Sequence, residues 1–147
     1  MYIKMKKRTH KLFLQTEYNF SLIGIVTQEK DYKISWEINK LLGIELSKSK
    51  NLEINTNKEY IIKSFTVHTY LDNDLMITYN LISNKCENGV LLNQFKNIDF
   101  LFKIDFENNF NEIINFINKI KSLSEIISVF EIKASDLKEK QKQHLIF

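Results

Sequence analysis

The chain has 147 residues and a mass of 17.5 kDa, which suits one domain because single hydrophobic cores commonly form at about 100–150 residues. With 44% apolar, 12% aromatic and 27% charged residues, it is too hydrophobic for a disordered chain, and no apolar run approaches the roughly 20 residues of a membrane-spanning helix. The net charge of +3 is less than the charge of residues 1–11, which contain five cationic side chains and no acid. We therefore expect a single domain over residues 1–147, with a basic arm at about 1–9 and a polar tail at about 134–147.

The chain contains one cysteine, Cys86, so an internal disulfide cannot form. Residues 1–11 lack the apolar stretch of a secretory signal. These two observations predict a reduced, soluble, cytoplasmic protein that does not associate with membranes.

Two short apolar segments follow the basic arm. Alternation predicts a strand from His10 to Glu17, with Leu12 and Leu14 on one side. Residues 20–28 are too short and mixed to assign, and Ser21 could cap a helical turn there.

A helix is predicted from Tyr32 to Leu42, with Asp31 as its cap and Gly43 just past its end. One face of this helix is aliphatic and carries Ile34, Ile38, Leu41 and Leu42. A neighbouring stripe consists of Tyr32, Trp36 and Asn39. Together the two stripes cover roughly 220° of the circumference, so we expect the helix to be covered on two sides.

Alternating residues at 65–71 and 75–81 predict an antiparallel hairpin with a three-residue loop at 72–74. The inner set would pair Phe65, Val67, Thr69 and Leu71 with Leu75, Ile77, Tyr79 and Leu81. The outer set would be Thr66, His68, Tyr70, Met76, Thr78 and Asn80.

The last third of the chain is expected to contain a strand, a helix and a further strand. Residues 91–95 are expected to anchor a loop or short helix, and 98–106 to form a strand whose even positions face the core and whose odd positions are mostly wet. Asn109 and Glu112 resemble a capping box that opens a helix, and a last strand is predicted from Ile126 to Ile132. The order of elements predicts an α+β fold, with an antiparallel sheet of about five strands and two or three helices on one face. That arrangement is ferredoxin-like with an extra strand.

Three segments resemble the IPExxxVDY family of uncharacterised Bacteroidetes proteins. They are residues 31–39 (Asp-Tyr-Lys-Ile-Ser-Trp-Glu-Ile-Asn), Leu91-Leu92 leading into Ile98-Asp99-Phe100, and Leu145-Ile146-Phe147. The sequences at 123–125 and 129–131 keep the Glu and Val of the family's name-giving motif but lack its Pro, Asp and Tyr. The resemblance implies a bacterial cytoplasmic protein of unassigned activity, and no catalytic residue is carried over.

The ionisable residues do not form a recognisable catalytic, cofactor or metal motif. The three histidines are far apart in sequence, and there is no second cysteine for a thiolate pair. Cys86 with His68 is the one thiol-base pair available, and nothing in the sequence orients the imidazole. We therefore expect no metal, cofactor or catalytic residues, and a non-enzyme rather than an enzyme.

The sequence favours a non-catalytic interaction or adaptor module that binds a protein. The expected partner-binding residues are Tyr32, Trp36, Asn39, Leu145, Ile146 and Phe147. A fully buried helix and a tail folded back onto its own core would explain the same apolar residues without a partner. The alternative is an RNA-associated accessory protein, in which the basic arm neutralises phosphates and the outer hairpin row offers Tyr70 for stacking.

Overall fold

The computed structural model describes residues 19–56 and 60–147, so the strand expected at His10–Glu17 and the basic arm lie outside it. The helices are α2 (Asp31–Leu42), α3 (Ile113–Lys121) and α4 (Glu139–His144), with 3₁₀ turns η1 (Asn93–Phe95) and η2 (Ala134–Asp136). The longer strands are β1 (Phe20–Thr27), β3 (Leu52–Thr56), β4 (Ile61–Phe65), β5 (Val67–Asp72), β6 (Ile77–Ser83), β9 (Phe100–Phe106) and β10 (Ile126–Ile132). The shortest strands are β2 (Ser47–Lys48), β7 (Lys85–Cys86) and β8 (Gly89–Val90).

Six strands form an antiparallel sheet in the order β10-β1-β9-β6-β5-β2. The strands β1, β6, β9 and β10, with α2 and α3 between them in the chain, have the βαββαβ order of a ferredoxin-like core. Strands β5 and β2 extend this core at the β6 edge. The predicted α+β class with an antiparallel sheet is confirmed.

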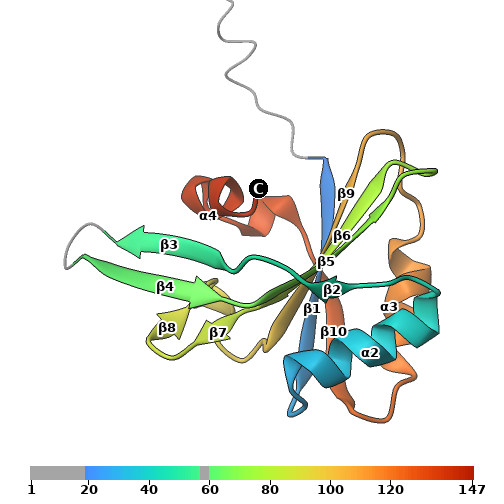
Figure 1. Cartoon of the computed structure of the whole chain (residues 1–147), viewed down its shortest axis with the longest axis horizontal. Coiled ribbons are helices and arrows are strands. Elements are labelled where there is room, and N and C mark those ends of the chain that lie inside the picture. The colour runs from blue at the N-terminus through green and yellow to red at the C-terminus, as the bar shows by residue number, and fades with distance from the viewer. Residues whose placement is uncertain (1–18, 57–59) are drawn as a thin grey trace, which may run out of the picture.

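Both long helices cover one face of the sheet (Figure 1). The core on this face joins the aliphatic side of α2, one side of α3 and alternate residues of the central strands. Its fully buried members are Ile23, Ile25, Ile34, Ile38, Phe102, Ile104 and Ile120. The even positions of β9 therefore face the core, as their alternation predicts.

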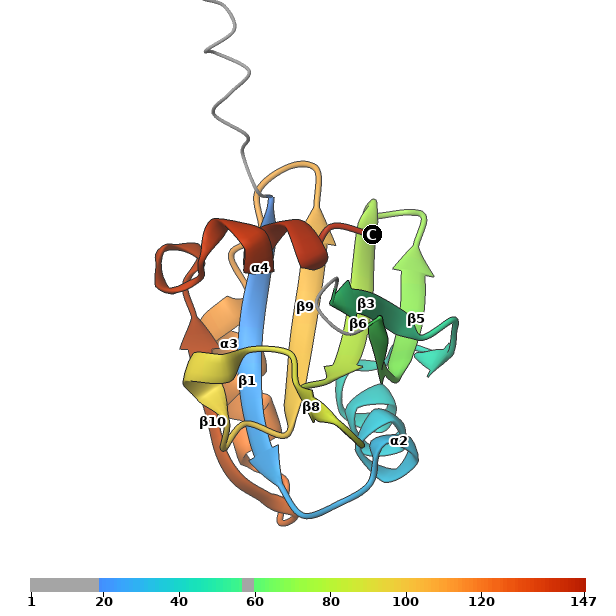
Figure 2. The same cartoon turned by 90° about the vertical axis from the view of Figure 1, so that its left-hand side faces the viewer.

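The opposite face of the sheet is covered as well, which corrects the expectation that the odd positions of 98–106 are mostly wet. Figure 2 shows α4, β3 and β8 in front of the sheet. A second core forms there, with Leu101 on β9 fully buried and Lys103 only 1% exposed. The covering segments come from distant parts of the chain, so the alternation within β9 contains no signal for them.

The unassigned segment 20–28 forms β1, which lies between β9 and β10. Ser21 is paired with Ile104 in the sheet and caps no helix. Because both faces of this central strand are covered, Leu22 and Ile23 are both buried, and the strand lacks the alternation that would have identified it.

The hairpin forms, but its register differs from the expected one. Asp72 pairs with Ile77 around a four-residue turn in which Met76 has φ 54°, so Tyr70 pairs with Tyr79 and His68 with Leu81. The turn is one residue longer than expected. The pairing of β5 with β6 shifts by an odd number of residues, so the residues of β5 exchange faces relative to those of β6. His68 and Tyr70 therefore lie on the helix-covered face, and the expected outer row does not exist as one surface.

The ends of two helices show which local signals were reliable. Gly43 ends α2 in the left-handed conformation at φ 68°, as predicted, and its N–H donates to the carbonyl of Asn39. Helix α3 begins at Ile113, four residues later than the expected capping position at Asn109. Phe110 instead packs from the preceding loop, 5.8 Å from the ring of Phe106 and 5.4 Å from that of Phe116.

Candidate binding site

A groove of about 450 Å³ lies between the β3–β4 hairpin, β8 and α4. The apolar part of its lining is Ile54, Phe65, Val90 and Leu91. The polar part is Asn55, Thr56, Lys63, Asn93, Lys138, Lys140, Gln141 and His144. None of these twelve residues is acidic, so the three lysines make the lining positively charged.

Three lysines supply the positive charge of the groove. Among residues 19–56 and 60–147, the ion pairs involve other side chains, so Lys63, Lys138 and Lys140 have no carboxylate partner there. The stem of Lys63 lies against Gly89, where an added Cβ would come within 2.8 Å of the lysine Cε and Nζ. The missing side chain at Gly89 therefore leaves the space that Lys63 occupies.

Specific contacts hold α4 beside the hairpin. The side-chain amides of Gln94 and Gln141 donate to each other's oxygens at 2.8 Å, and Leu137 and Leu145 are buried in the second core. The segment expected to be a polar tail therefore packs as η2 and α4. Burial, together with the nearby Lys140, lowers the pKa of His144.

The expected partner-binding residues on α2 fall into two environments. Tyr32 is 65% exposed and Trp36 53% exposed, which corrects the expectation that α2 is covered on two sides. The Nζ of Lys40 lies 3.7 Å from the centroid of the Trp36 ring. The side chain of Asn39 bonds to both the N–H and the carbonyl of Leu46, so Asn39 holds the chain after α2.

The remaining expected residues fold back onto the second core. Leu145 is fully buried, whereas Ile146 and Phe147 are about half exposed. The structure thus places Leu145 away from any outside surface, and it separates Ile146 and Phe147 from Tyr32 and Trp36, because these two pairs lie on opposite faces of the sheet.

A buried lysine lies beneath this folded-back segment. The Nζ of Lys103 is 3.1 Å from Oδ2 of Asp105, donates a hydrogen bond to the carbonyl oxygen of Leu145, and lies 4.2 Å from the ring centroid of Phe147. Burial lowers the pKa of Lys103, and Asp105 opposes that shift; burial likewise raises the pKa of Asp105, opposed by Lys103 and Asn80. These contacts tie the ammonium to the folded-back segment, so Lys103 anchors that segment.

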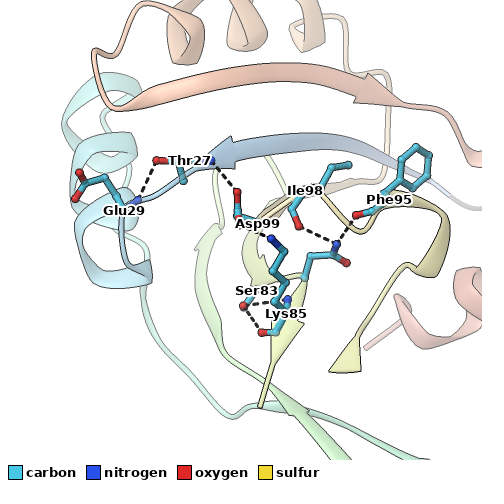
Figure 3. A network of polar contacts seen from close by, with 8 residues as sticks. Thr27, Glu29, Ser83, Lys85, Phe95, Ile98 and Asp99 are labelled. Atoms are coloured by element: carbon cyan, nitrogen blue, oxygen red, sulfur yellow. Dashed lines mark hydrogen bonds and ion pairs between the residues drawn. The ribbon is translucent and has the colours of Figure 1, made fainter. Parts of the chain in front are cut away.

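A second cavity, of about 550 Å³, lies at the end of β1. Several of its lining residues form a network of polar contacts (Figure 3). Asp99 accepts from the N–H of Thr27 at 2.9 Å and from Nζ of Lys85 at 2.8 Å. The hydroxyl of Ser83 donates to the carbonyl of Lys85 and has no base beside it in this network. The network joins chain segments and offers no activated nucleophile.

A neighbouring asparagine completes this network. Asn84 is fully buried, and its side-chain amide donates to the carbonyls of Phe95 and Ile98, each at 2.9 Å. Its oxygen accepts from the N–H of Leu92. These bonds hold the loop before β9, where Leu92 is buried as the sequence predicts.

The thiol-base pair considered from sequence is not assembled. His68 lies on the face covered by α2, with Nε2 3.9 Å from Oδ2 of Asp31, whereas Cys86 packs against the core of the opposite face. Within the described residues, no three His, Cys, Asp or Glu side chains gather closely enough to hold a metal ion. The helices described here are also too short and polar to cross a membrane.

His68 predicts acid-sensitive stability. Its pKa is lowered, chiefly by burial, and its Nδ1 is the one buried side-chain nitrogen or oxygen without a partner in the part of the chain described. Because the folded-state pKa lies below the ordinary 6.5, the unfolded chain binds the proton first as the pH falls. The contribution of neutral His68 to the free energy of unfolding is therefore complete above pH 6.5 and is lost as the pH falls through the lowered pKa.

We therefore expect the loss of stability below pH 6.5 to be smaller in His68→Leu than in the unaltered chain, as measured by urea unfolding at a series of pH values. His144→Leu, at a more exposed histidine, is the matched control and should remove less of the pH dependence. Identical pH dependence in the unaltered chain and His68→Leu would contradict this assignment.

No protein-family model matches the chain, and no curated protein is significantly similar to it in sequence. The resemblance to the IPExxxVDY family stays a prediction.

Sequence reasoning did not identify the groove. Lys138, Lys140 and His144 stand in the lysine-rich segment expected to be a polar tail, but Lys63 and Phe65 come from a hairpin more than 70 residues earlier in the chain. The available signal was the positive charge of 138–144 beside the apolar Leu145, which is typical of a helix that packs on one side and faces solvent on the other.

Proposed function

We propose that this protein is a non-catalytic interaction module that holds an acidic segment of a partner protein in the groove between the β3–β4 hairpin and α4. One observation carries the proposal: three lysines without carboxylate partners in the described part of the chain line a concave site whose twelve described lining residues include no acid. Concave sites of roughly 300–1,000 Å³ are the usual size of ligand pockets. Complementary charge would select the partner and speed its encounter.

The lining favours a protein over RNA as the occupant. Proteins that bind single-stranded RNA stack bases on exposed aromatic rings. The aromatic side chain in the lining is Phe65, which is fully buried and has no free face for a base. The partly exposed apolar side chains of the lining, Ile54 and Val90, suit the aliphatic side chains of a peptide.

A short fluorescent peptide of alternating Glu and Val, with blocked ends, is expected to bind the full chain in fluorescence anisotropy. Replacing all three lysines, as Lys63→Gln, Lys138→Gln and Lys140→Gln together, should weaken binding about tenfold. Each exposed ion pair contributes about 0.2–1 kcal/mol, and about 1.4 kcal/mol corresponds to a factor of ten. A peptide of alternating Lys and Val should not bind.

The matched control removes two lysines and the exposed aromatic of α2, as Lys33→Gln, Lys40→Gln and Trp36→Ala, and should leave binding unchanged. Loss of binding in this control alone would overturn the groove and support the aromatic stripe of α2. A single-stranded RNA oligonucleotide that binds more tightly than the peptide, with the same dependence on the groove lysines, would overturn the protein partner in favour of RNA.

A further inference from the structure

Strand β3 has one unpaired edge in the described part of the chain. It pairs with β4 from Leu52↔Phe65 to Thr56↔Ile61 and belongs to a sheet of two strands. No other backbone hydrogen bond to residues 52–56 is present among the described residues. An edge of this kind presents a row of backbone N–H and C=O groups that another extended chain can pair with.

This free edge borders the groove. In both views α4 lies on the upper side of β3, and Figure 1 shows β4 on the lower side. The lining takes Ile54, Asn55 and Thr56 from β3, and Lys140 and Gln141 from α4. A ligand in the groove therefore lies within reach of both the free edge of β3 and the cationic side chains, with Lys63 on the neighbouring β4.

The lining of the groove, which is partly apolar and partly cationic, fits the side chains of an extended chain. Alternate side chains of a strand point to opposite sides. Apolar side chains of the ligand can pack on the partly exposed Ile54 and Val90, while acidic ones reach the lysines. A folded helix or a nucleic-acid backbone would leave the amide and carbonyl groups of β3 without matching partners.

We infer that the acidic partner segment binds in extended conformation and adds to the free edge of β3 as a third strand beside β4. This inference rests on the proposed function and specifies how the same groove holds its ligand. Backbone pairing supplies affinity that does not depend on the partner's sequence, and the lysines select acidic segments.

The test uses the full chain and two analogues of the Glu-Val peptide, one N-methylated at every Glu and one at every Val. N-methylation removes the backbone donor and leaves the side-chain charge. Because only alternate N–H groups of a strand face one neighbour, one analogue should bind at least about tenfold more weakly and the other much as the parent peptide does.

Hydrogen exchange measured by NMR gives an independent readout. Alternate amides of β3 should exchange at least about tenfold more slowly when the parent peptide is bound, because they become hydrogen-bonded. Strand β10 is an edge strand of the large sheet and borders no part of this groove, so its amides should not change.

Equal binding of both analogues, without slowed exchange in β3, would overturn strand addition. If the three-lysine variant still weakened the parent peptide in that case, the proposed function would stand. Absence of any binding by the parent peptide would overturn the proposed function and the inference together.

Discussion

Asp105→Ala is expected to lower the free energy of unfolding by about 3 kcal/mol or more, because it leaves the Lys103 ammonium buried without a counter-charge. Lys103 is 1% exposed, and its other contacts are the carbonyl of Leu145 and the rings of Phe20 and Phe147. None of these groups carries a formal charge. Urea unfolding monitored by the fluorescence of Trp36 and by circular dichroism measures the loss.

A double variant separates charge from packing. Adding Lys103→Met to Asp105→Ala removes the buried charge and keeps an apolar stem of similar length, so most of the lost stability should return. Glu139→Ala is the matched control: its side chain is 63% exposed, its oxygen lies 3.9 Å from Nζ of Lys142, and its loss should cost no more than about 0.5 kcal/mol. A double variant no more stable than Asp105→Ala would contradict the role assigned to the charge.

The same pair predicts a response to alkali. The pKa of Lys103 is already lowered by burial, and Asp105 opposes that shift, so removing Asp105 lowers the pKa further. A folded-state pKa below the unfolded 10.5 means that stability rises with pH between the two values. The deficit of Asp105→Ala relative to the unaltered chain should therefore shrink as the pH approaches 10.5, and a constant deficit would count against it.

Phe102→Ala is expected to cost about 3–5 kcal/mol, because it leaves a cavity at the centre of the helix-covered core. Phe102 is fully buried, pairs with Ile23 on β1 and Leu81 on β6, and its ring centroid lies 6.0 Å from that of Tyr79. The measurement is the shift of the urea midpoint, with thermal unfolding as a second readout.

Two variants calibrate this effect. Phe102→Leu keeps part of the volume and should cost clearly less than Phe102→Ala. Ile127→Ala changes a side chain that is 64% exposed on β10 and should stay within about 0.5 kcal/mol of the unaltered chain. Equal losses for Phe102→Ala and Ile127→Ala would contradict the assignment of the core.

Elements with a strong local pattern were predictable. Four local predictions appear in the structure as expected: the even positions 100–104, the aliphatic side of α2, the glycine that ends it, and the strand 126–132. Ile98 is an exception, because it precedes β9 and packs in the core of the opposite face. Each depends on side chains a few residues apart, whose spacing directly reflects one buried face. The ferredoxin-like order then follows from the sequence of these elements.

The hairpin register shows where local reasoning stops. The residues 72–76 are consistent with more than one turn length, and a change of one residue exchanges every side chain between the faces. Pairing of Tyr70 with Tyr79 places both on the core covered by the helices, where Tyr79 is 4% exposed. The core of the assembled sheet, rather than the turn residues alone, selects this register.

The periodic elements, their order and the fold class are properties of the sequence, because each is set by neighbours along the chain. The covering of the second sheet face and the basic groove depend on contacts between segments far apart, such as Lys103 with Leu145, 42 residues away, and Gln94 with Gln141, 47 residues away. Such contacts leave no periodic trace in either segment. They form only when the chain closes long loops around a common core, and for that reason folding alone brings the lysines of the groove together.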